Sequence, residues 1–455
     1  MDILRKEIRD VTENIINQVH HRMELSKQIG ELKNKMSIDI NDEKAERDIR
    51  GSVLRLSKKI RMDTDFSARL LNILLMESVR LQEDQQSDAK HEQTHLAVFM
   101  KAKELEAMGK KIIHLEVGEP DFKPPKRVKH AIIRAYNHSL YHYTETRGIK
   151  RLRDAIAKKA RNNITGEEVI VTPGARFALF IAFQSLLKPG DEVIGIEPAW
   201  PAYKDCANLM GAKINFLKTT LEDRWLPNTR NLRKMINPST KMIVINYPNN
   251  PTGKLLDIRT QEQIVSIAKE NGIYLLSDEV YSDYTFGGFR SILESNYDKS
   301  VMISSFSKTY AMTGFRVGFA IARNEIISKL AKVQACALTS VAEPMQYSAL
   351  AALRADSASK NRLIIQKRLN LISERLKDMS LSFFEPEGGM YVYPRLNNNT
   401  NDTAIVEKLL DVGVAVAPGS GFGSSYKRFI RISACQGENV LKKGLAAFEH
   451  AMDTG

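Results

Sequence analysis

The sequence predicts two domains of different class, an all-α domain of three helices followed by a larger α/β domain. Two observations predict this division. Residues 3–36 carry apolar side chains at a spacing of three to four, without a proline. Beyond residue 95, apolar runs with the length of strands alternate with helical stretches. We place the helical domain at residues 1–85, a polar linker at 86–95 and the α/β domain at 96–455.

The composition is that of a globular protein, with 43% hydrophobic and 27% charged residues in a chain of 455. The formal net charge of +13 suits anionic ligands. Because basic residues are interleaved with acidic ones, we expect small anionic molecules as partners, and neither nucleic acid nor a membrane. The three cysteines lie far apart, so no disulfide framework or metal site is expected. The charged N-terminus and the lack of a long apolar run favour a cytoplasmic protein.

The first helix is predicted over Ile3–Met36, about 50 Å long. So small a domain cannot bury such a helix by itself, so we expect it to pair with a second copy of the chain. Arg22 and Lys33 are about 20° apart around the helix and share a face, whereas Arg5 points elsewhere, into the site of a partner. The apolar stripe of this helix is formed by Leu4, Ile8, Val11, Ile15, Leu25, Ile29, Leu32 and Met36.

Two further helices complete the N-terminal domain. One begins near Asp42, which stands four residues before Glu46, and the other covers Phe66–Gln86. Ser78 and Gln82 share a face of that last helix, because they too are four residues apart. The three helices therefore present a set of charged and amide side chains on facing surfaces.

In number and order these helices and polar residues resemble the all-helical chorismate mutases, which are intertwined dimers. The resemblance implies that basic residues clamp the two carboxylates of chorismate. It implies that Lys33 and Gln82 bond the ether oxygen and that Glu46 holds the ring hydroxyl, so that these three are catalytic. The remaining residues that it assigns to substrate binding are Arg5, Arg22, Asp42 and Ser78. The step is pericyclic, so catalysis would come from holding the reactive conformer and from electrostatic stabilisation.

One position departs from the mutase pattern. Ala45 stands where the family usually has an arginine, and Lys44 lies about 100° away around the helix. The affinity for chorismate, or the activity, therefore stays open at this point. The alternative interpretation is a helical dimerisation module with solvated charges.

In the α/β domain, the most distinctive stretch is residues 304–318, which follow the apolar run Val301–Ile303. Lys308 is flanked there by small hydroxyl residues, and Arg316 follows between two glycines. An amine of this kind can form a Schiff base with an aldehyde, and the hydroxyls with the arginine suit a phosphate. An aldehyde joined to a phosphate is pyridoxal 5'-phosphate. A lysine on an exposed loop is the alternative for this motif taken alone.

Other distinctive residues also follow predicted strands, at the edge where ligands of parallel sheets bind. Residues 172–176 connect a strand to a helix and could offer backbone N–H groups to a phosphate. Asn250 is held between prolines, Asp278 ends a strand, and Arg431 lies in an apolar strand and needs a carboxylate. The strands are predicted at residues 168–172, 192–196, 242–246, 274–276 and 301–304.

Taken together and in this order, these motifs resemble the fold type I pyridoxal-phosphate aminotransferases of the aspartate aminotransferase superfamily. The resemblance runs from about Leu96 to Gly455. It implies large and small subdomains and a homodimer. Its further marks are residues 117–122, 143–153, 197–200 and 388–391.

The resemblance implies a role for each motif residue. Lys308 would bind the coenzyme covalently and move the proton, and Asp278 would pair with the pyridine nitrogen. Asn250 and Tyr281 would bond the ring's phenolic oxygen, and Trp200 would stack on the ring. The phosphate would be held by Gly174, Ala175, Arg176, Ser305 and Arg316, with Tyr143 from the other subunit.

The substrate would be bound by its carboxylate. The resemblance implies that Arg431 takes the α-carboxylate and that the backbone near Gly118 closes over it.

The sequence thus predicts a bifunctional enzyme of aromatic amino acid biosynthesis, converting chorismate to prephenate and transaminating prephenate or an aromatic 2-oxo acid. An aspartate or broad-range aminotransferase carrying a mutase-like domain is the alternative. A pyridoxal-phosphate decarboxylase or lyase would use the same fold. A transcription regulator with an aminotransferase-like domain is disfavoured, because residues 1–90 lack a Gly-rich wing and their charges roughly balance.

Overall fold

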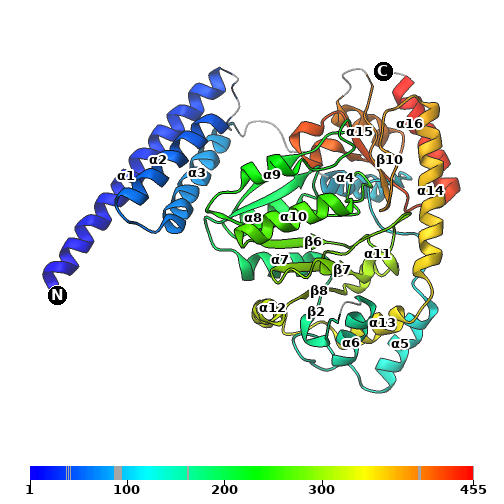
Figure 1. The fold of residues 1–455 in the computed structure, drawn as a ribbon. Coiled ribbons are helices and arrows are strands. Elements are labelled where there is room, and N and C mark those ends of the chain that lie inside the picture. The colour runs from blue at the N-terminus through cyan, green and yellow to red at the C-terminus, as the bar shows by residue number, and fades with distance from the viewer. Residues whose placement is uncertain are drawn as a thin grey trace.

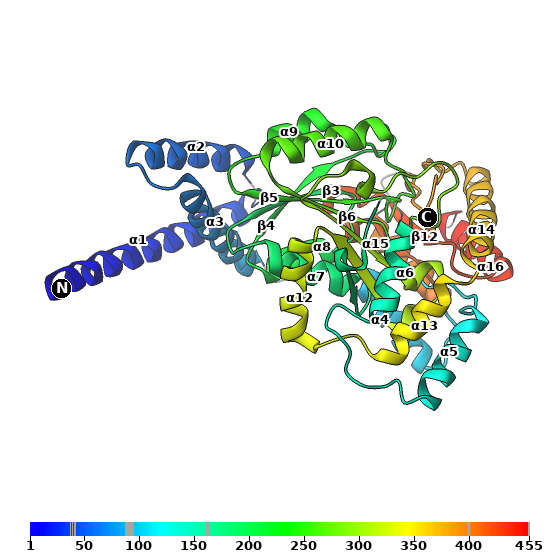
Figure 2. The same ribbon diagram turned by 60° about the horizontal axis from the view of Figure 1, so that its bottom comes forward.

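The computed structural model describes residues 1–36, 38, 40, 42–86, 95–160, 163–397 and 401–453. A helical arm stands beside a larger α/β body, and α2 and α3 lie between the projecting end of α1 and that body (Figures 1 and 2). The predicted fold classes of the two parts are therefore confirmed. The expected linker falls mostly on residues 87–94, which lie outside the described residues.

The arm consists of α1 (Asp2–Lys35), α2 (Glu43–Lys59) and α3 (Thr64–Gln86). The C-terminal half of α1 packs against α3 and buries Ser26 and Gly30. Its N-terminal half extends past α3 (Figure 1), and its apolar residues there are exposed, Ile8 by 68%. The stripe predicted from the sequence is therefore uncovered in a single chain.

A mixed sheet forms the centre of the large body, with strand order β2-β8-β7-β6-β5-β3-β4. Only β8, among the described strands of this sheet, runs antiparallel to its neighbours, so the predicted mostly parallel sheet is confirmed. Its inner strands β5 and β6 are buried on both faces, which explains their continuous apolar sequences. The strands are β2 (Val169–Thr172), β3 (Glu192–Glu197), β4 (Lys213–Lys218), β5 (Thr240–Asn246), β6 (Tyr274–Asp278), β7 (Ser300–Ser305) and β8 (Gly318–Ala322).

Helices cover both faces of this sheet, as Figure 2 shows for α9 and α10 on one side and α7, α8 and α12 on the other. Apolar side chains from the sheet and the helices form two core clusters, one on each face. The helices of this part are α5 (Lys126–Asn137), α6 (Lys150–Ala160), α7 (Ala175–Leu186), α8 (Ala202–Leu209), α9 (Thr229–Met235), α10 (Ile258–Asn271), α11 (Phe306–Thr309), α12 (Asn324–Leu338) and α13 (Glu343–Leu353).

The first and last segments of the large body form a smaller subdomain with a core cluster of its own. It contains a parallel pair, β1 (Ile113–His114) with β10 (Val414–Ala415), and a three-stranded antiparallel sheet of β11, β12 and β9. These three strands are β9 (Tyr391–Val392), β11 (Ala417–Pro418) and β12 (Ile430–Ser433). The helices are α4 (His95–Ala107), α14 (Ala358–Asp378), α15 (Asp402–Asp411) and α16 (Glu438–Asp453).

Candidate active sites

A cavity of about 340 Å³ lies at the carboxyl ends of β5, β6 and β7, where the small subdomain meets the sheet. Parallel strands bring their last residues to one edge of a sheet, so segments distant in sequence converge there. The cavity gathers most of the residues that the sequence analysis assigned to this domain. Those lining it are Gly118, Ala175, Arg176, Trp200, Asn250, Asp278, Tyr281, Ser305, Lys308, Arg316 and Arg431.

Lys308 and Asp278 both line this cavity. Lys308 is in the single turn α11, directly after β7, and its Nζ donates to the Gly118 carbonyl at 2.6 Å. Asp278 ends β6, is 5% exposed and accepts a hydrogen bond from the Tyr203 hydroxyl at 2.8 Å. Burial raises the pKa of the Asp278 carboxyl to about 6, although Tyr203 and Lys308 favour its ionised form. The site thus contains an amine and a buried carboxylate whose pKa lies close to neutral pH.

An anion cradle adjoins the cavity, and its residues Ser305 and Arg316 line the cavity itself. Gly174 caps the N-terminus of α7 with a φ of +84°, and a Cβ there would lie 2.6 Å from Nη2 of Arg316. Gly318 is equally restricted, since its Cβ would lie 2.5 Å from the Gly174 carbonyl carbon. Ser305 donates to the Ser307 hydroxyl at 2.8 Å beside them. A helix N-terminus, a guanidinium and hydroxyls in contact are the groups that bind phosphate.

Aromatic side chains flank the space between the amine and the cradle. The Trp200 ring lies under the Arg176 guanidinium at 4.8 Å and meets Tyr203 edge-on at 5.7 Å. The Tyr281 hydroxyl is 2.9 Å from that of Tyr391, and burial raises the pKa of Tyr281. A flat ring bound between these groups would stack on an aromatic side chain with one face and accept hydrogen bonds at its edge.

Arg431 is a buried cation without a carboxylate partner among the described residues. It is 2% exposed on β12. Its Nη1 donates to Oδ1 of Asn250 at 2.9 Å, its Nη2 to the Glu116 carbonyl, and its Nε has no hydrogen-bond partner in the described part of the chain. The guanidinium lies 4.2 Å from the centre of the Tyr391 ring. A buried guanidinium with unused donors is suited to a carboxylate ligand.

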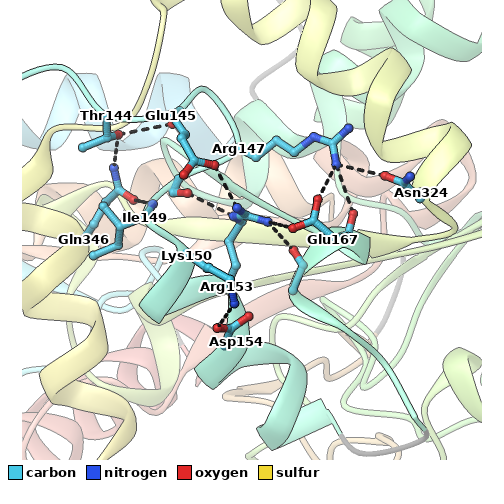
Figure 3. A network of polar contacts seen from close by, with 12 residues as sticks. Thr144, Glu145, Arg147, Ile149, Lys150, Arg153, Asp154, Glu167, Asn324 and Gln346 are labelled. Carbon is cyan, nitrogen blue, oxygen red and sulfur yellow. Dashed lines mark hydrogen bonds and ion pairs between the residues drawn. The ribbon is translucent and has the colours of Figure 1, made fainter.

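Tyr143 and Gly174 do not line the cavity. Tyr143 is 90% exposed, next to a loop that Arg153 holds through an ion pair with Glu145 at 2.8 Å (Figure 3). Arg153 is 3% exposed and also pairs with Glu167 at 2.9 Å. The network fixes the loop and leaves Tyr143 free, so its placement in a partner's site stays a prediction.

A second polar group of residues lies between α1 and α3. Arg22 donates to the Leu74 carbonyl at 2.7 Å and to the Ser78 hydroxyl, and Ser26 donates to Ser78 at 3.0 Å. Burial lowers the pKa of Arg22. Gln82, 7% exposed, has an Oε1 atom without a partner in the described residues. The structure thus brings Arg22 and Ser78 into contact, and Gln82 lies one turn further along α3 with an unsatisfied acceptor.

The remaining predicted residues of the helical domain have other partners. Lys33 donates to the Ile40 carbonyl at 2.5 Å. Asp42 stands just outside α2 as its N-cap and accepts from the N–H groups of Lys44 and Ala45, which lowers its pKa. The prediction that this helix begins near Asp42 is therefore confirmed, with Asp42 as the N-cap that stabilises the helix start from outside. Its role toward substrate stays a prediction.

Glu46 and Arg5 complete this set. Glu46 forms an ion pair with Lys213 of the large domain at 2.5 Å. Arg5 pairs with Asp2 at 3.4 Å on the projecting half of α1, roughly 25 Å along the helix from Arg22. A single chain therefore does not bring Arg5 to the other polar residues.

Sequence reasoning missed Tyr203, Tyr391 and Glu116, which contact Asp278, Tyr281 and Arg431. Tyr203 stands three residues after Trp200, on the first turn of α8, and this spacing was the available signal. Leu96 and Phe99 of α4 also line the cavity. No local motif marks them, because the small subdomain brings α4 there from a distant part of the chain.

The fold and the larger site define the class of protein, an α/β enzyme whose partly buried lysine shares a cavity with an anion cradle and a buried carboxylate. The chain belongs to the family aminotransferase class I and II, whose model matches residues 110–448. Residues 4–83 match chorismate mutase type II. The chain therefore joins a chorismate mutase domain to an aminotransferase domain, as predicted.

Relatives of known name cover most of the aminotransferase part. The aspartate/prephenate aminotransferase of Thermus thermophilus is 34% identical over 368 residues, 78% of this chain and 95% of that protein. A (5-formylfuran-3-yl)methyl phosphate transaminase of Methanocaldococcus jannaschii is 35% identical, over 76% of this chain and 92% of its own length.

Solved structures agree with these relatives. The aspartate aminotransferase of Thermus thermophilus with maleate superposes with a TM-score of 0.76 at 34% identity, covering 79% of this chain and 96% of that chain. The Thermotoga maritima aspartate aminotransferase gives 0.75 at 35% identity, with 79% and 96% covered. Within the described residues, we find no helix with the length and apolarity that crossing a bilayer requires.

Proposed function

We propose that this chain is a bifunctional enzyme that rearranges chorismate to prephenate and transaminates prephenate or an aromatic 2-oxo acid made from it. The observation that carries the proposal is the presence, in one chain, of a mutase domain and an aminotransferase cavity lined by more than one guanidinium. The product of the first reaction is an anion of the class that such a cavity binds.

Pyridoxal 5'-phosphate fits the residues of the larger site. The cradle of Gly174, Ser305 and Arg316 admits a phosphate because side chains other than glycine at 174 and 318 would fill it. When bound, this coenzyme supplies an electron sink for the α-carbon of an amino acid. Asp278 would hold the proton of the ring nitrogen, and its burial makes that charge pair strong.

The chain's own residues would then carry the substrate and the proton. Arg431 would bind the α-carboxylate through its unused donors, and Asn250 would keep its amide N–H groups for the coenzyme because its Oδ1 accepts from Arg431. Lys308, whose side chain lines the cavity, would take the proton from the substrate α-carbon on its Nζ and carry it to the carbon that accepts it. Water exclusion by α4 and by Tyr391 would favour these steps.

The second carboxylate of prephenate needs a second cation. Arg176 lines the same cavity and stacks on Trp200, and Lys308 and Arg316 are engaged elsewhere in it. An aromatic ring and a guanidinium side by side suit a ligand with a ring and a carboxylate. The same cation would also bind aspartate, so an aspartate or broad-range aminotransferase is the second candidate, which the name of the Thermus relative also covers.

The mutase site would be completed by a second copy of the chain. The projecting half of α1 exposes its apolar stripe and carries Arg5 away from its own Arg22, Ser78 and Gln82. In a symmetric dimer the two projecting halves would cover each other, and each Arg5 would enter the partner's site. A homodimer would thus cover the apolar stripe and supply the missing cation to each mutase site.

Two variants of the full chain test the two-site assignment. Lys308→Ala should lower transamination by about 10²- to 10⁴-fold or more and remove the visible absorbance of the bound coenzyme, while chorismate turnover is kept. Arg22→Ala should lower chorismate turnover by a similar factor and leave transamination intact. Purified protein would be assayed with chorismate alone, then with prephenate, phenylpyruvate and oxaloacetate as amino acceptors.

The outcomes separate the candidates. Loss of both activities from either substitution, with an unchanged thermal unfolding curve, would contradict two independent sites. Turnover of aspartate far above that of phenylalanine or tyrosine would favour the second candidate. Release of carbon dioxide from labelled amino acid, without a 2-oxo acid, would indicate a decarboxylase.

A further inference from the structure

The mutase domain touches the aminotransferase domain through a charge-complementary contact on α2. Glu46 and Arg50 are four residues apart and share a face of this helix. Opposite them, Glu192 on β3 and Lys213 on β4 are register partners at the edge of the large sheet. An acid and a base on the helix therefore meet a base and an acid on the sheet.

The distances define two close pairs. Lys213 Nζ lies 2.5 Å from Oε2 of Glu46, and Nη2 of Arg50 lies 2.8 Å from Oε1 of Glu192. The side chains of Lys213, Glu46 and Arg50 are 21–23% exposed and that of Glu192 is 1% exposed. Such partly buried pairs are screened less by solvent and salt than pairs on an open surface.

Glu192 is a fixed point of this contact. Its Oε2 accepts hydrogen bonds from Nδ2 of Asn237 at 2.6 Å and from Nδ2 of Asn215 at 3.1 Å. Arg50, held by Glu192, also reaches Oε2 of Glu46 at 3.5 Å. The buried acid of the aminotransferase domain thereby constrains the position of α2 as well as the charge near Glu46.

Both cations approach the same oxygen of Glu46. Lys213 and Arg50 contact Oε2, whereas the described contacts of this side chain leave Oε1 available. A carboxylate fixed through one oxygen can accept a hydrogen bond from a ligand at the other. Glu46 is the residue to which the resemblance to chorismate mutases assigns the ring hydroxyl of chorismate.

We propose that Lys213 is a positioning residue of the mutase site, supplied by the aminotransferase domain, and that it acts by fixing the carboxylate of Glu46. The inference rests on the proposed mutase function. Chorismate rearrangement then depends on the docked position of the neighbouring domain. The aminotransferase domain is accordingly a structural part of the first active site.

The other contacts between the domains that the structure describes contain none of the predicted mutase residues. Asp65 of α3 pairs with Lys241, and Nδ2 of Asn72 donates to the Gly190 carbonyl at 2.8 Å. Lys241 therefore provides a matched control. It is a lysine of the same sheet and forms an ion pair with the same helical domain, but its partner is Asp65 of α3 and not Glu46 of α2.

The experiment compares full-chain variants in both assays. Lys213→Gln should lower kcat for chorismate by about tenfold or more, since small misplacements of a catalytic group have large effects on rate. Lys213→Arg should stay within about twofold of the original rate because it keeps the charge. Lys241→Gln should leave chorismate kinetics unchanged, and transamination should be unchanged in every variant. In a Glu46→Gln background, adding Lys213→Gln should cause no further loss.

Any result that differs from these expectations overturns the proposal. An unchanged kcat in Lys213→Gln shows that the pair does not position Glu46. An equal loss in Lys241→Gln shows that domain docking in general is responsible. A higher kcat in Lys213→Gln shows that the pair withdraws Glu46 from the substrate. If the unmodified chain turns over no chorismate, the proposed mutase function itself fails, and this inference with it.

Discussion

Asp278 and Arg431 show how single buried charges are kept in the larger site. The carboxyl of Asp278 has a tyrosine hydroxyl and a backbone N–H as donors, yet burial still raises its pKa to about 6. Arg431 donates hydrogen bonds to a backbone carbonyl and to an amide oxygen, but to no carboxylate among the described residues. Each charge is thus incompletely compensated, and a ligand of opposite charge would be bound more tightly for this reason.

The pKa of Asp278 predicts a pH dependence of coenzyme affinity. The ring nitrogen of the coenzyme, bound in its protonated form, needs the ionised carboxylate, which is present above pH 6 and is lost as the pH falls through 6. Affinity for pyridoxal 5'-phosphate should therefore be about tenfold weaker at pH 5 than at pH 7.5. Titration of the coenzyme absorbance at several pH values would measure it.

Asp278→Asn is the control for this prediction. The coenzyme phosphate titrates near pH 6 as well and contributes to the pH dependence of both proteins. The variant should bind more weakly at pH 7.5 and lose part of the dependence. Equal pH slopes for the two proteins would show that the Asp278 carboxyl does not control binding.

At the scale of elements, α1 is a long helix whose stabilising contacts are divided. Its C-terminal half is covered by α3, and its N-terminal half carries the exposed apolar stripe. An isolated exposed apolar face of this length is unusual for a monomer and marks an interface. The helix therefore predicts a shared site, in which Arg5 of one chain and Arg22 of the other act on one substrate.

Mixing two inactive variants tests whether the site is shared. Arg5→Ala and Arg22→Ala should each lack chorismate turnover, but co-expressed chains form mixed dimers in which one site has both arginines. About a quarter of all sites should then be intact, assuming random pairing in a two-fold dimer. Chorismate turnover of the mixture should recover to about that fraction.

As the control, each variant is expressed alone in the same total amount, and its homodimers should stay inactive. If Arg5 served its own chain, the mixed dimers would contain no intact site. A mixture as inactive as its components, with mixed dimers verified by mass spectrometry, would contradict the shared site.

The sequence predicts elements and site residues where the signal is local. Lys308, Asp278 and the turn at residues 172–176 are predictable because strand, turn and polar residue are adjacent in the chain. Strands β5 and β6 are predictable because they are continuously apolar. Strand β4 and the two-residue strands of the small subdomain carry no such signal, since distant partners determine them.

Contacts between distant elements were beyond sequence reasoning for the same reason. The hydroxyl of Tyr391 reaches Tyr281 across the boundary of the two subdomains, and Lys213 reaches Glu46 across the two domains. Each pair is separated by more than a hundred residues. No periodicity or motif relates such positions, so only the assembled fold reveals them.

At the scale of the whole molecule, buried acids couple stability to pH. Glu279 is 3% exposed beneath the larger site, and its Oε1 accepts from the Ser277 hydroxyl at 2.9 Å and from the Ile292 N–H at 2.8 Å. Burial raises the pKa of its carboxyl to about 7, and burial also raises that of Glu197 to about 7. Both acids therefore favour the protonated form in the folded protein.

The sign of the effect follows from proton binding. Between pH 4.5, the ordinary value for a glutamate, and pH 7, the folded chain retains a proton on Glu279 that the unfolded chain has released. Stability must then fall as the pH rises through this window, and the loss is complete above pH 7. A shift of this size corresponds to roughly 3 kcal/mol in the free energy of unfolding.

Glu279→Gln should remove this component while keeping the acceptor oxygen for Ser277 and Ile292. Calorimetry of both proteins at pH 5 and pH 8 should show a larger drop in Tm for the original chain than for the variant. Glu197 and the exposed acids titrate in both proteins, so the difference between them isolates Glu279. An identical drop would mean that Glu279 is ionised in the folded protein at neutral pH, with the burial cost met by its two hydrogen bonds.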